Sequence, residues 1–174
     1  MNLQENRNQI KSFSEKLLEK KLLGIGGTSV RYIAHHDTPW PQHLFEHGII
    51  LNGEPQVIAG YKPDECHGNT LALFLFTDKQ IEVWNGYALA PDNHANIGVW
   101  SEHTWAIHKG AIIETTPLPR KIYFGSPHPN PSAWAEDELK SKNMRRDKTM
   151  DYLEIFRPEA WGALLNLIHA EAAE

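Results

Sequence analysis

The chain has 174 residues, of which 41% are hydrophobic and 22% charged, a composition typical of one globular domain. Its formal net charge of −5 argues against a general nucleic-acid binder or a protein that binds anionic membranes, since both usually present a basic face. No segment approaches the roughly eighteen consecutive apolar residues of a membrane span. We therefore expect a single domain over residues 1–174 with neither nucleic-acid nor membrane partners.

The cysteine content and the first twenty residues predict the compartment. One cysteine, Cys66, cannot form an intrachain disulfide, which favours a reducing environment. Residues 1–20 are polar and lack the continuous apolar core of a secretion signal. Together these features predict a cytoplasmic protein.

The N-terminal part of the chain predicts one helix followed by a strand and a loop. Leucines and other apolar residues recur at helical spacing over residues 3–23, and Gly24 is a suitable C-cap. Residues 30–34 are typical of a short strand. Histidine, aromatic residues and proline fill residues 35–48, which we expect to begin as a loop and to pass into a short helical turn.

The next segment predicts a hairpin and then a central helix. Apolar residues at 49–51 and 56–59 flank Asn52-Gly53, a strong signal for a tight hairpin turn. After Lys62-Pro63, an apolar run follows Cys66 as far as Phe76. Its length and composition predict a buried helix that begins near Cys66.

Four strands and further helices are expected after this central helix. Residues 80–90, 97–107, 111–115 and 120–125 are typical of strands, and His108-Lys109-Gly110 is a hairpin-like connection. Residues 132–174 are expected to form a helical extension, with Ser132 as an N-cap. The order predicts an α+β fold in which the central helix packs on an antiparallel sheet.

Cys66 is the first candidate for chemistry. The free N–H groups and positive dipole end at the start of a helix stabilise a thiolate and lower the pKa of a cysteine. Asp64 and Glu65 act in the opposite direction, because nearby carboxylates raise that pKa. A nucleophilic Cys66 therefore requires a histidine as its base.

His103 and Glu114 are candidates for that base and for the acid that orients it. They lie on the two strands joined around Lys109-Gly110. If the connection turns near Lys109, residues at equal distances from it face each other, so that position 103 lies opposite position 114 or 115. A histidine and a carboxylate on one face of a hairpin are what a Cys–His–acid triad requires.

These residues resemble the transglutaminase-like superfamily of papain-like cysteine enzymes. That family places its cysteine at the start of a central helix, followed by a His-Ala-Trp strand and a strand ending in Asp-Pro-Thr. This chain has His103-Thr104-Trp105 and Glu114-Thr115-Thr116. Cysteine-to-histidine order and spacing are also similar to those of the arylamine acetyltransferases. The resemblance covers about residues 56–125, although Glu replaces the usual Asp and Asp64-Glu65 replaces the usual Trp or Gly.

The resemblance implies a papain-like core and a cysteine hydrolase or acyltransferase. Cys66 would attack an amide, ester or thioester of a small-molecule or peptide substrate, with His103 as base and Glu114 as orienting acid. No cofactor is expected. The backbone N–H of Cys66 would stabilise the oxyanion, and the other substrate-contacting candidates are His67, Asn69, Trp84, Trp100 and Trp105.

Other interpretations of the same residues stay open. Cys66 is also typical of a small buried core residue, and Glu114 has Lys109 and Arg120 as possible ion-pair partners. A non-catalytic binding module would keep the fold but leave the sulfur out of reach of His103. A metalloprotein would use His43 and His47, which are four residues apart, with a third ligand from His35, His36 or His94.

Overall fold

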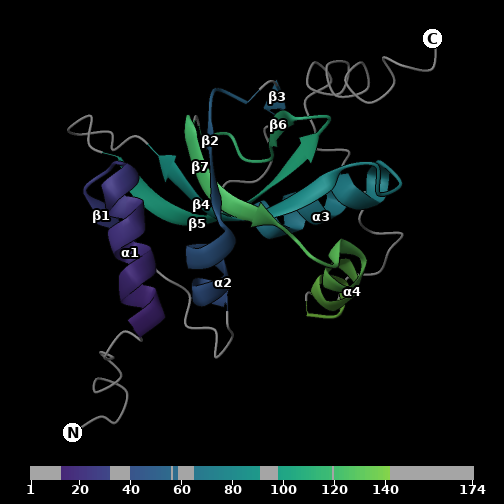
Figure 1. The fold of residues 1–174 in the computed structure, drawn as a ribbon. Helices are drawn as coiled ribbons and strands as arrows, with labels where there is room; N and C mark the ends of the chain where they lie inside the picture. Colours follow the sequence, from purple (N-terminus) through teal and green to yellow (C-terminus); the bar gives the residue numbers. More distant parts are fainter. Residues whose placement is uncertain are drawn as a thin grey trace, which may run out of the picture.

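The protein was analysed as a computed structural model, which describes residues 13–31, 40–55, 57–58, 65–90, 98–118 and 120–141. Four helices and seven strands occupy these ranges and confirm the α+β class (Figure 1). The helices are α1 (Phe13–Ile25), α2 (Trp40–His47), α3 (Cys66–Phe76) and α4 (Pro131–Ser141). The strands are β1 (Ser29–Val30), β2 (Ile49–Asn52), β3 (Val57–Ile58), β4 (Glu82–Ala90), β5 (Val99–His108), β6 (Ala111–Glu114) and β7 (Ile122–Pro127).

The strands form one mixed sheet in the order β2-β7-β4-β5-β6-β3, and β1 pairs with β5. Its central pairings are antiparallel, as predicted, and β4 and β5 form the longest ladder. The pairings of β1 with β5 and of β3 with β6 are parallel, so the prediction of a purely antiparallel sheet is wrong. Strands β1 and β3 are only two residues long, which is too short for the sequence to predict how they pair.

Helices cover one face of this sheet in two groups. The apolar helix α3 packs with α4 on Val83, Ala106 and Ile113 of neighbouring strands. Helices α1 and α2 pack on the same face, against a second cluster that contains Trp100 and Phe124. Because side chains alternate along a strand, odd-numbered residues of β4 and even-numbered residues of β5 share this face. Figure 1 shows the two helix groups on opposite sides of the molecule.

The opposite face of the sheet carries a third cluster. Trp84, Trp105 and Tyr123 lie there with several aliphatic residues, and all three aromatic side chains are buried. Their rings contact one another, since the Trp105 and Tyr123 centroids are 5.1 Å apart. Aromatic residues therefore fill this face without a covering helix among the residues that the structure describes.

The hairpin predicted over residues 49–59 does not form. Strand β2 pairs with β7, and β3 pairs with β6 at the other end of the sheet. A turn does follow Asn52, where Gly53 adopts a φ of 139° and donates its N–H to the carbonyl of Lys121 at 2.9 Å. The turn signal was right, but the chain leaves it for a different strand because both sheet edges offer unpaired backbone groups.

The turn between β5 and β6 sets the register near the candidate site. Lys109 and Gly110 both have positive φ, 49° and 82°, as a two-residue hairpin turn requires. His108 pairs with Ala111 and Ala106 with Ile113. This register places position 114 opposite position 105, so the prediction that residue 103 faces residue 114 or 115 is wrong.

Three helix predictions differ in extent from the structure. Helix α1 begins at Phe13, and residues 3–12 of the predicted helix lie outside the described residues. Residues 40–47, expected as a loop and a turn, form the helix α2, whose Pro41 occupies its first turn. Helix α4 begins at Pro131, and Asn130 caps it by accepting the N–H of Ala133 at 3.1 Å, in place of the predicted Ser132. Most of the predicted extension, residues 142–174, also lies outside the described ranges.

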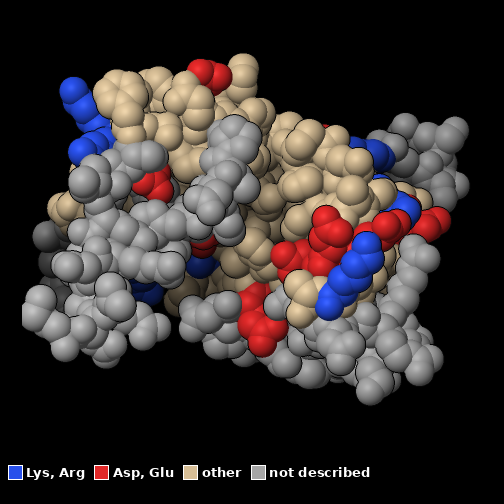
Figure 2. Space-filling view, turned by 90° about the horizontal axis from the view of Figure 1, so that it is seen from below, with Lys and Arg blue, Asp and Glu red and all other residues tan. Residues whose placement is uncertain are grey.

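The surface near α4 is acidic. Figure 2 shows Asp and Glu side chains gathered on the right of that view, where α4 lies, with basic side chains beside them. Helix α4 contributes Glu136, Asp137 and Glu138. None of the described helices has both the length and the apolar composition needed to cross a bilayer.

Candidate active site

The N-terminal part of α3 docks against the edge of β5. Thr70 donates its hydroxyl to the carbonyl of Thr104 at 3.2 Å, and Asn69 donates its side-chain N–H to the carbonyl of Thr115 at 2.8 Å. Strand β6 pairs with β5 only as far as Ala106 and Ile113, so the edge beyond Ala106 is open to the helix. This docking fixes Cys66, the first residue of α3, beside the middle of β5.

The thiol of Cys66 is partly buried and protonated at neutral pH. Burial raises its pKa above the ordinary 9.0, and the nearby carboxylate of Glu102 adds to the rise. The backbone N–H groups of Thr104 and His67 and the charge of Arg120 lower the pKa only in part. The helix start acts in the predicted direction, but the expectation of a lowered pKa for Cys66 is wrong, because desolvation outweighs the N–H groups.

His103 and Glu114 form a buried contact on the face opposite the helices. The Nε2 atom of His103 lies 2.9 and 3.0 Å from the two carboxylate oxygens of Glu114. The His103 side chain is 1% exposed and that of Glu114 is fully buried. Residues 103, 105 and 114 share one face, so the longer Glu side chain reaches His103 diagonally past Trp105. The His103 ring stacks on Trp105 with an interplanar angle of 18°.

Glu114 is held by a set of donors. Its carboxylate accepts the backbone N–H and the hydroxyl of Thr116, both at 2.9 Å, and the hydroxyl of Tyr123 at 2.9 Å. Arg120 forms an ion pair with it at 3.2 Å. Burial alone would raise the pKa of Glu114, but His103, Arg120 and the Thr116 N–H lower it to about 2. Glu114 is therefore a carboxylate throughout the physiological range.

The same contacts determine the tautomer of His103. Burial lowers the pKa of His103 below 6.5, and the carboxylate of Glu114 offsets this only in part. A neutral imidazole carries one proton, and the carboxylate can only accept, so Nε2 carries the proton and Nδ1 keeps its lone pair. His103 thus has the protonation state of a general base.

Cys66 and His103 both adjoin Thr104, but no hydrogen bond joins the thiol to the imidazole within the described part of the chain. The structure thus brings together two of the three predicted triad members, and the thiol of the third contacts the backbone of Thr104, the residue after His103. Catalytic hydrogen bonds in unliganded enzymes are often long and tighten when substrate binds. The Cys66–His103 contact is the part of the site that substrate would have to complete.

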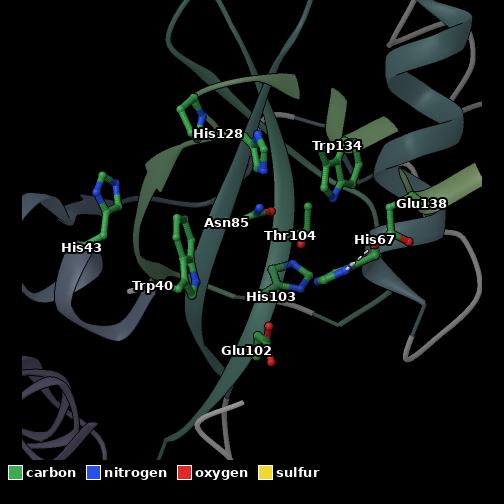
Figure 3. Close-up of a pocket in the computed structure, with 11 residues that line it drawn as sticks. Trp40, His43, His67, Asn85, Glu102, His103, Thr104, His128, Trp134 and Glu138 are labelled. Carbon is green, nitrogen blue, oxygen red and sulfur yellow. Dashed lines mark ion pairs between the residues drawn. The ribbon is translucent and has the colours of Figure 1, made fainter. Parts of the chain in front are cut away.

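A cavity of about 470 Å³ opens beside His103 on the helix-covered face, between the two helix groups. In Figure 3 the side chains of α2 and those of α3 and α4 surround Asn85, Thr104 and His103. His67 faces Glu138 across one wall, with Nδ1 3.5 Å from the carboxylate. The lining consists of Trp40, His43, His67, Asn85, Glu102, His103, Thr104, His128, Pro129, Trp134 and Glu138.

Of the predicted substrate-contacting residues, only His67 lines this cavity. Asn69 is fully buried and contributes to the docking of α3. The three predicted tryptophans lie in the core clusters and outside this lining: Trp84, Trp100 and Trp105. Trp100 donates its indole N–H to the carbonyl of Gly26 at 2.7 Å. All three lie on the long central strands β4 and β5, where neighbouring side chains bury them.

Several residues of the site were not predicted from the sequence. Arg120 was considered only as a rival partner for Glu114, whereas the structure has it beside Glu114 together with His103. By contrast, Trp40 and His43 belong to the histidine-rich segment 35–47, which the sequence already suggests as a part of the substrate cleft. Asn85 and Trp134 carry no local signal, because only the folded sheet brings them to one cavity.

The metal-binding interpretation rests on α2. His43 and His47 share this helix, and their ring centroids are 4.9 Å apart. Among the residues that the structure describes, no three His, Cys, Asp or Glu side chains form a group suited to a metal ion. The proposed third ligands, His35, His36 and His94, lie outside those residues.

Comparisons with known proteins give no assignment for this site. No protein-family model, no curated protein and no solved structure matches the chain. The resemblance to transglutaminase-like enzymes stays a prediction.

Proposed function

We propose that the protein is a cysteine hydrolase or acyltransferase that uses Cys66, His103 and Glu114. The observation that carries the proposal is the buried contact between His103 and an ionised Glu114, whose closest atoms are 2.9 Å apart; His103 is also among the residues that line the cavity. Maintaining a carboxylate and an imidazole together in the interior is costly unless the pair is well satisfied. Such pairs are frequent at catalytic sites, where the carboxylate fixes the orientation and the tautomer of the histidine base.

In the proposed reaction, the substrate carbonyl lies between Cys66 and the cavity. The thiol proton passes to Nδ1 of His103 as the sulfur forms a bond to the carbonyl carbon. Glu114 stabilises the imidazolium that forms, and His103 then gives the proton to the leaving alcohol, thiol or amine. Water or an acceptor amine attacks the acyl-enzyme, with His103 again as base, and releases the free thiol.

The resting protonation states of Cys66 and His103 favour the use of His103 as a general base during the attack. The thiol is protonated and His103 is neutral, so the site is not a preformed thiolate–imidazolium pair. Proton transfer is then part of the attack itself, which is general-base catalysis. The backbone N–H of Cys66, at the start of α3, is not used by the hydrogen bonds of the helix itself and is suited to the developing oxyanion.

The finer features of fold and location belong to the same proposal. A cysteine at the start of a helix, followed by His and acid strands, supports a papain-like, transglutaminase-like core. The free thiol of Cys66 supports a reducing compartment such as the cytoplasm.

Burst kinetics with p-nitrophenyl acetate test the proposal. Wild type should release a rapid burst of p-nitrophenol close to one equivalent of protein, and Cys66→Ala should show none. His103→Asn should slow the burst by at least about 100-fold, the usual contribution of a general base. His47→Asn, on an exposed part of α2 that does not line the cavity, is the matched control and should behave as wild type. A burst of equal rate in Cys66→Ala would rule out the proposed nucleophile.

A second candidate is a binding module that uses the cavity without chemistry at Cys66. It is favoured by the raised pKa of the Cys66 thiol and because no hydrogen bond joins this thiol to the His103 imidazole within the described residues. In that case wild type and Cys66→Ala would give no burst, and both would bind the same ligand with the same affinity.

A further inference from the structure

A row of uncharged polar side chains on the sheet extends from the floor of the cavity to the neighbouring strand β7. Asn85 of β4 pairs with Thr104 of β5 on one side and with Ser126 of β7 on the other. Directly opposite residues of antiparallel strands point to the same face, so the three side chains form one line. The line lies on the helix-covered face, and Asn85 and Thr104 line the cavity directly (Figure 3).

Each member of this row has a buried polar atom without a partner. The hydroxyls of Thr104 and Ser126 and the side-chain oxygen of Asn85 make no hydrogen bond to any described residue. Thr104 is fully buried and Ser126 is 3% exposed. A buried polar group that loses its water and gains no partner costs roughly 1–3 kcal/mol. Three such groups in one line therefore indicate a site that a ligand or water completes.

The walls around the row are aromatic. Trp40 of α2 and Trp134 of α4 line the cavity from its two sides, and the histidine rings His43 and His128 lie beside them. Figure 3 shows these rings arranged around Asn85 and Thr104. A few convergent polar groups on a floor between aromatic walls are typical of a small-molecule site. The cavity volume of about 470 Å³ is within the range of such sites.

The charges of the described lining disfavour one class of ligand. Among the residues that the structure describes, the lining includes the carboxylates of Glu102 and Glu138, the latter facing His67, and neither Lys nor Arg. A carboxylate or phosphate would meet no Lys or Arg of this described lining and would lie near two carboxylates. The row itself offers neutral donors and acceptors, because an amide and a hydroxyl can act as either. A neutral group that has both an N–H and a C=O matches this floor.

We infer that the cavity binds a neutral carboxamide attached to a flat apolar body. The amide lies on the row, where it pairs with Asn85 and the Thr104 hydroxyl, and the apolar body lies between Trp40 and Trp134. This binding site does not depend on a reaction at Cys66 and would exist in the non-catalytic module as well. If the proposed enzyme is correct, the same site defines the substrate class.

Binding of three matched probes to the full chain tests the inference. Benzamide, benzoate and benzylamine have similar size and differ in charge. Titrations followed by two-dimensional NMR should show benzamide shifting the Asn85 side-chain amide and the indole N–H signals of Trp40 and Trp134. We expect benzamide to bind at least tenfold more tightly than benzoate or benzylamine. Tighter binding of benzylamine would show that the cavity prefers a cation to a neutral amide, and this would overturn the inference.

Variants of the row provide the second measurement. Asn85→Leu and Thr104→Val should weaken benzamide binding at least tenfold, while the free energy of unfolding stays the same or rises, because an unpartnered polar atom is removed. Asn52→Leu and Thr28→Val, at exposed positions, are the matched controls and should bind as wild type. Equal benzamide binding by all five proteins, or no benzamide binding by wild type, would show that the row holds only water.

Discussion

The imidazole of His103 and the carboxylate of Glu114 are in contact although they do not face each other in the strand register. The Nε2 atom of His103 lies 2.9 and 3.0 Å from the two carboxylate oxygens of Glu114, yet the strand register places Glu114 opposite Trp105. The contact is diagonal, and it depends on the length of the Glu side chain. An Asp at this position would be one methylene shorter. The glutamate that departs from the family pattern is therefore the residue that this register requires.

Glu114 is expected to be important for stability as well as for the site. Glu114→Gln keeps the shape but removes the negative charge between His103 and Arg120, which leaves the buried Arg120 uncompensated. We expect a loss of about 3–5 kcal/mol in the free energy of unfolding, measured in urea. Glu54→Gln is the control, because its ion pair with Lys121 is largely exposed, and it should cost less than about 1 kcal/mol. Equal effects of the two variants would contradict a buried, paired Glu114.

Stability should decrease in two steps as the pH falls. Below pH 6.5 His103 becomes protonated in the unfolded chain, whereas in the folded protein its lowered pKa keeps it neutral. Proton binding therefore stabilises the unfolded state, and the free energy of unfolding decreases. Below pH 4.5 the same holds for Glu114 until the pH reaches about 2, and this step amounts to about 3 kcal/mol. Urea unfolding at a series of pH values measures both steps.

Two variants assign the first of these steps. His103→Asn should reduce the slope between pH 6.5 and 5, and His128→Asn should remove a further part, since burial also lowers the pKa of His128. A wild-type protein whose stability rises as the pH falls from 6.5 would contradict a neutral, buried His103.

The thiol of Cys66 should react slowly with a simple electrophile. Because burial raises its pKa, iodoacetamide at pH 7 should alkylate Cys66 more slowly than it alkylates glutathione, and the rate should still be rising above pH 9. Alkylation in urea is the control and should restore the rate of a free thiol. Fast labelling with a plateau below pH 7 would show a thiolate and contradict the protonated resting state.

Gly86 should not accept a side chain. A Cβ at this position would lie 2.1 Å from the carbonyl oxygen of Phe124 and 2.5 Å from the Cα of Gly125, both of them backbone atoms in the middle of the sheet. We expect Gly86→Ala to lower the free energy of unfolding by about 3 kcal/mol. Gly24→Ala has open space and should be neutral or stabilising, so a comparable loss in both variants would contradict the packing of β4 on β7.

The sequence predicted those elements whose signals are local. The apolar run after Cys66 correctly indicated α3, and alternation and turn residues located the antiparallel strands β4 to β7. Apart from the pairing of β5 with β6, the sequence did not predict which strands pair with one another. Asn52-Gly53 marked a turn, but only the open edges of the finished sheet determine that β2 joins β7 and that β3 joins β6.

Predictions about the site failed where they required burial or distance. The effect of the helix start on Cys66 was predictable in sign, but the desolvation that outweighs it depends on the packing of α3 against β5. The tryptophans were expected at the cleft because of their chemistry, whereas the cavity takes Trp40 and Trp134 from helices distant in sequence. No spacing rule connects those two positions.

Peptide mapping of the trapped acyl-enzyme tests the central claim most directly. Wild type and His103→Asn are mixed with p-nitrophenyl acetate, quenched in acid within the burst, digested and analysed by mass spectrometry. The proposed mechanism predicts an acetyl group on Cys66 in wild type and at least about 100-fold slower formation of this adduct in His103→Asn. Acetylation that avoids Cys66, or that reaches it at the same rate in both proteins, would contradict a nucleophile activated by His103.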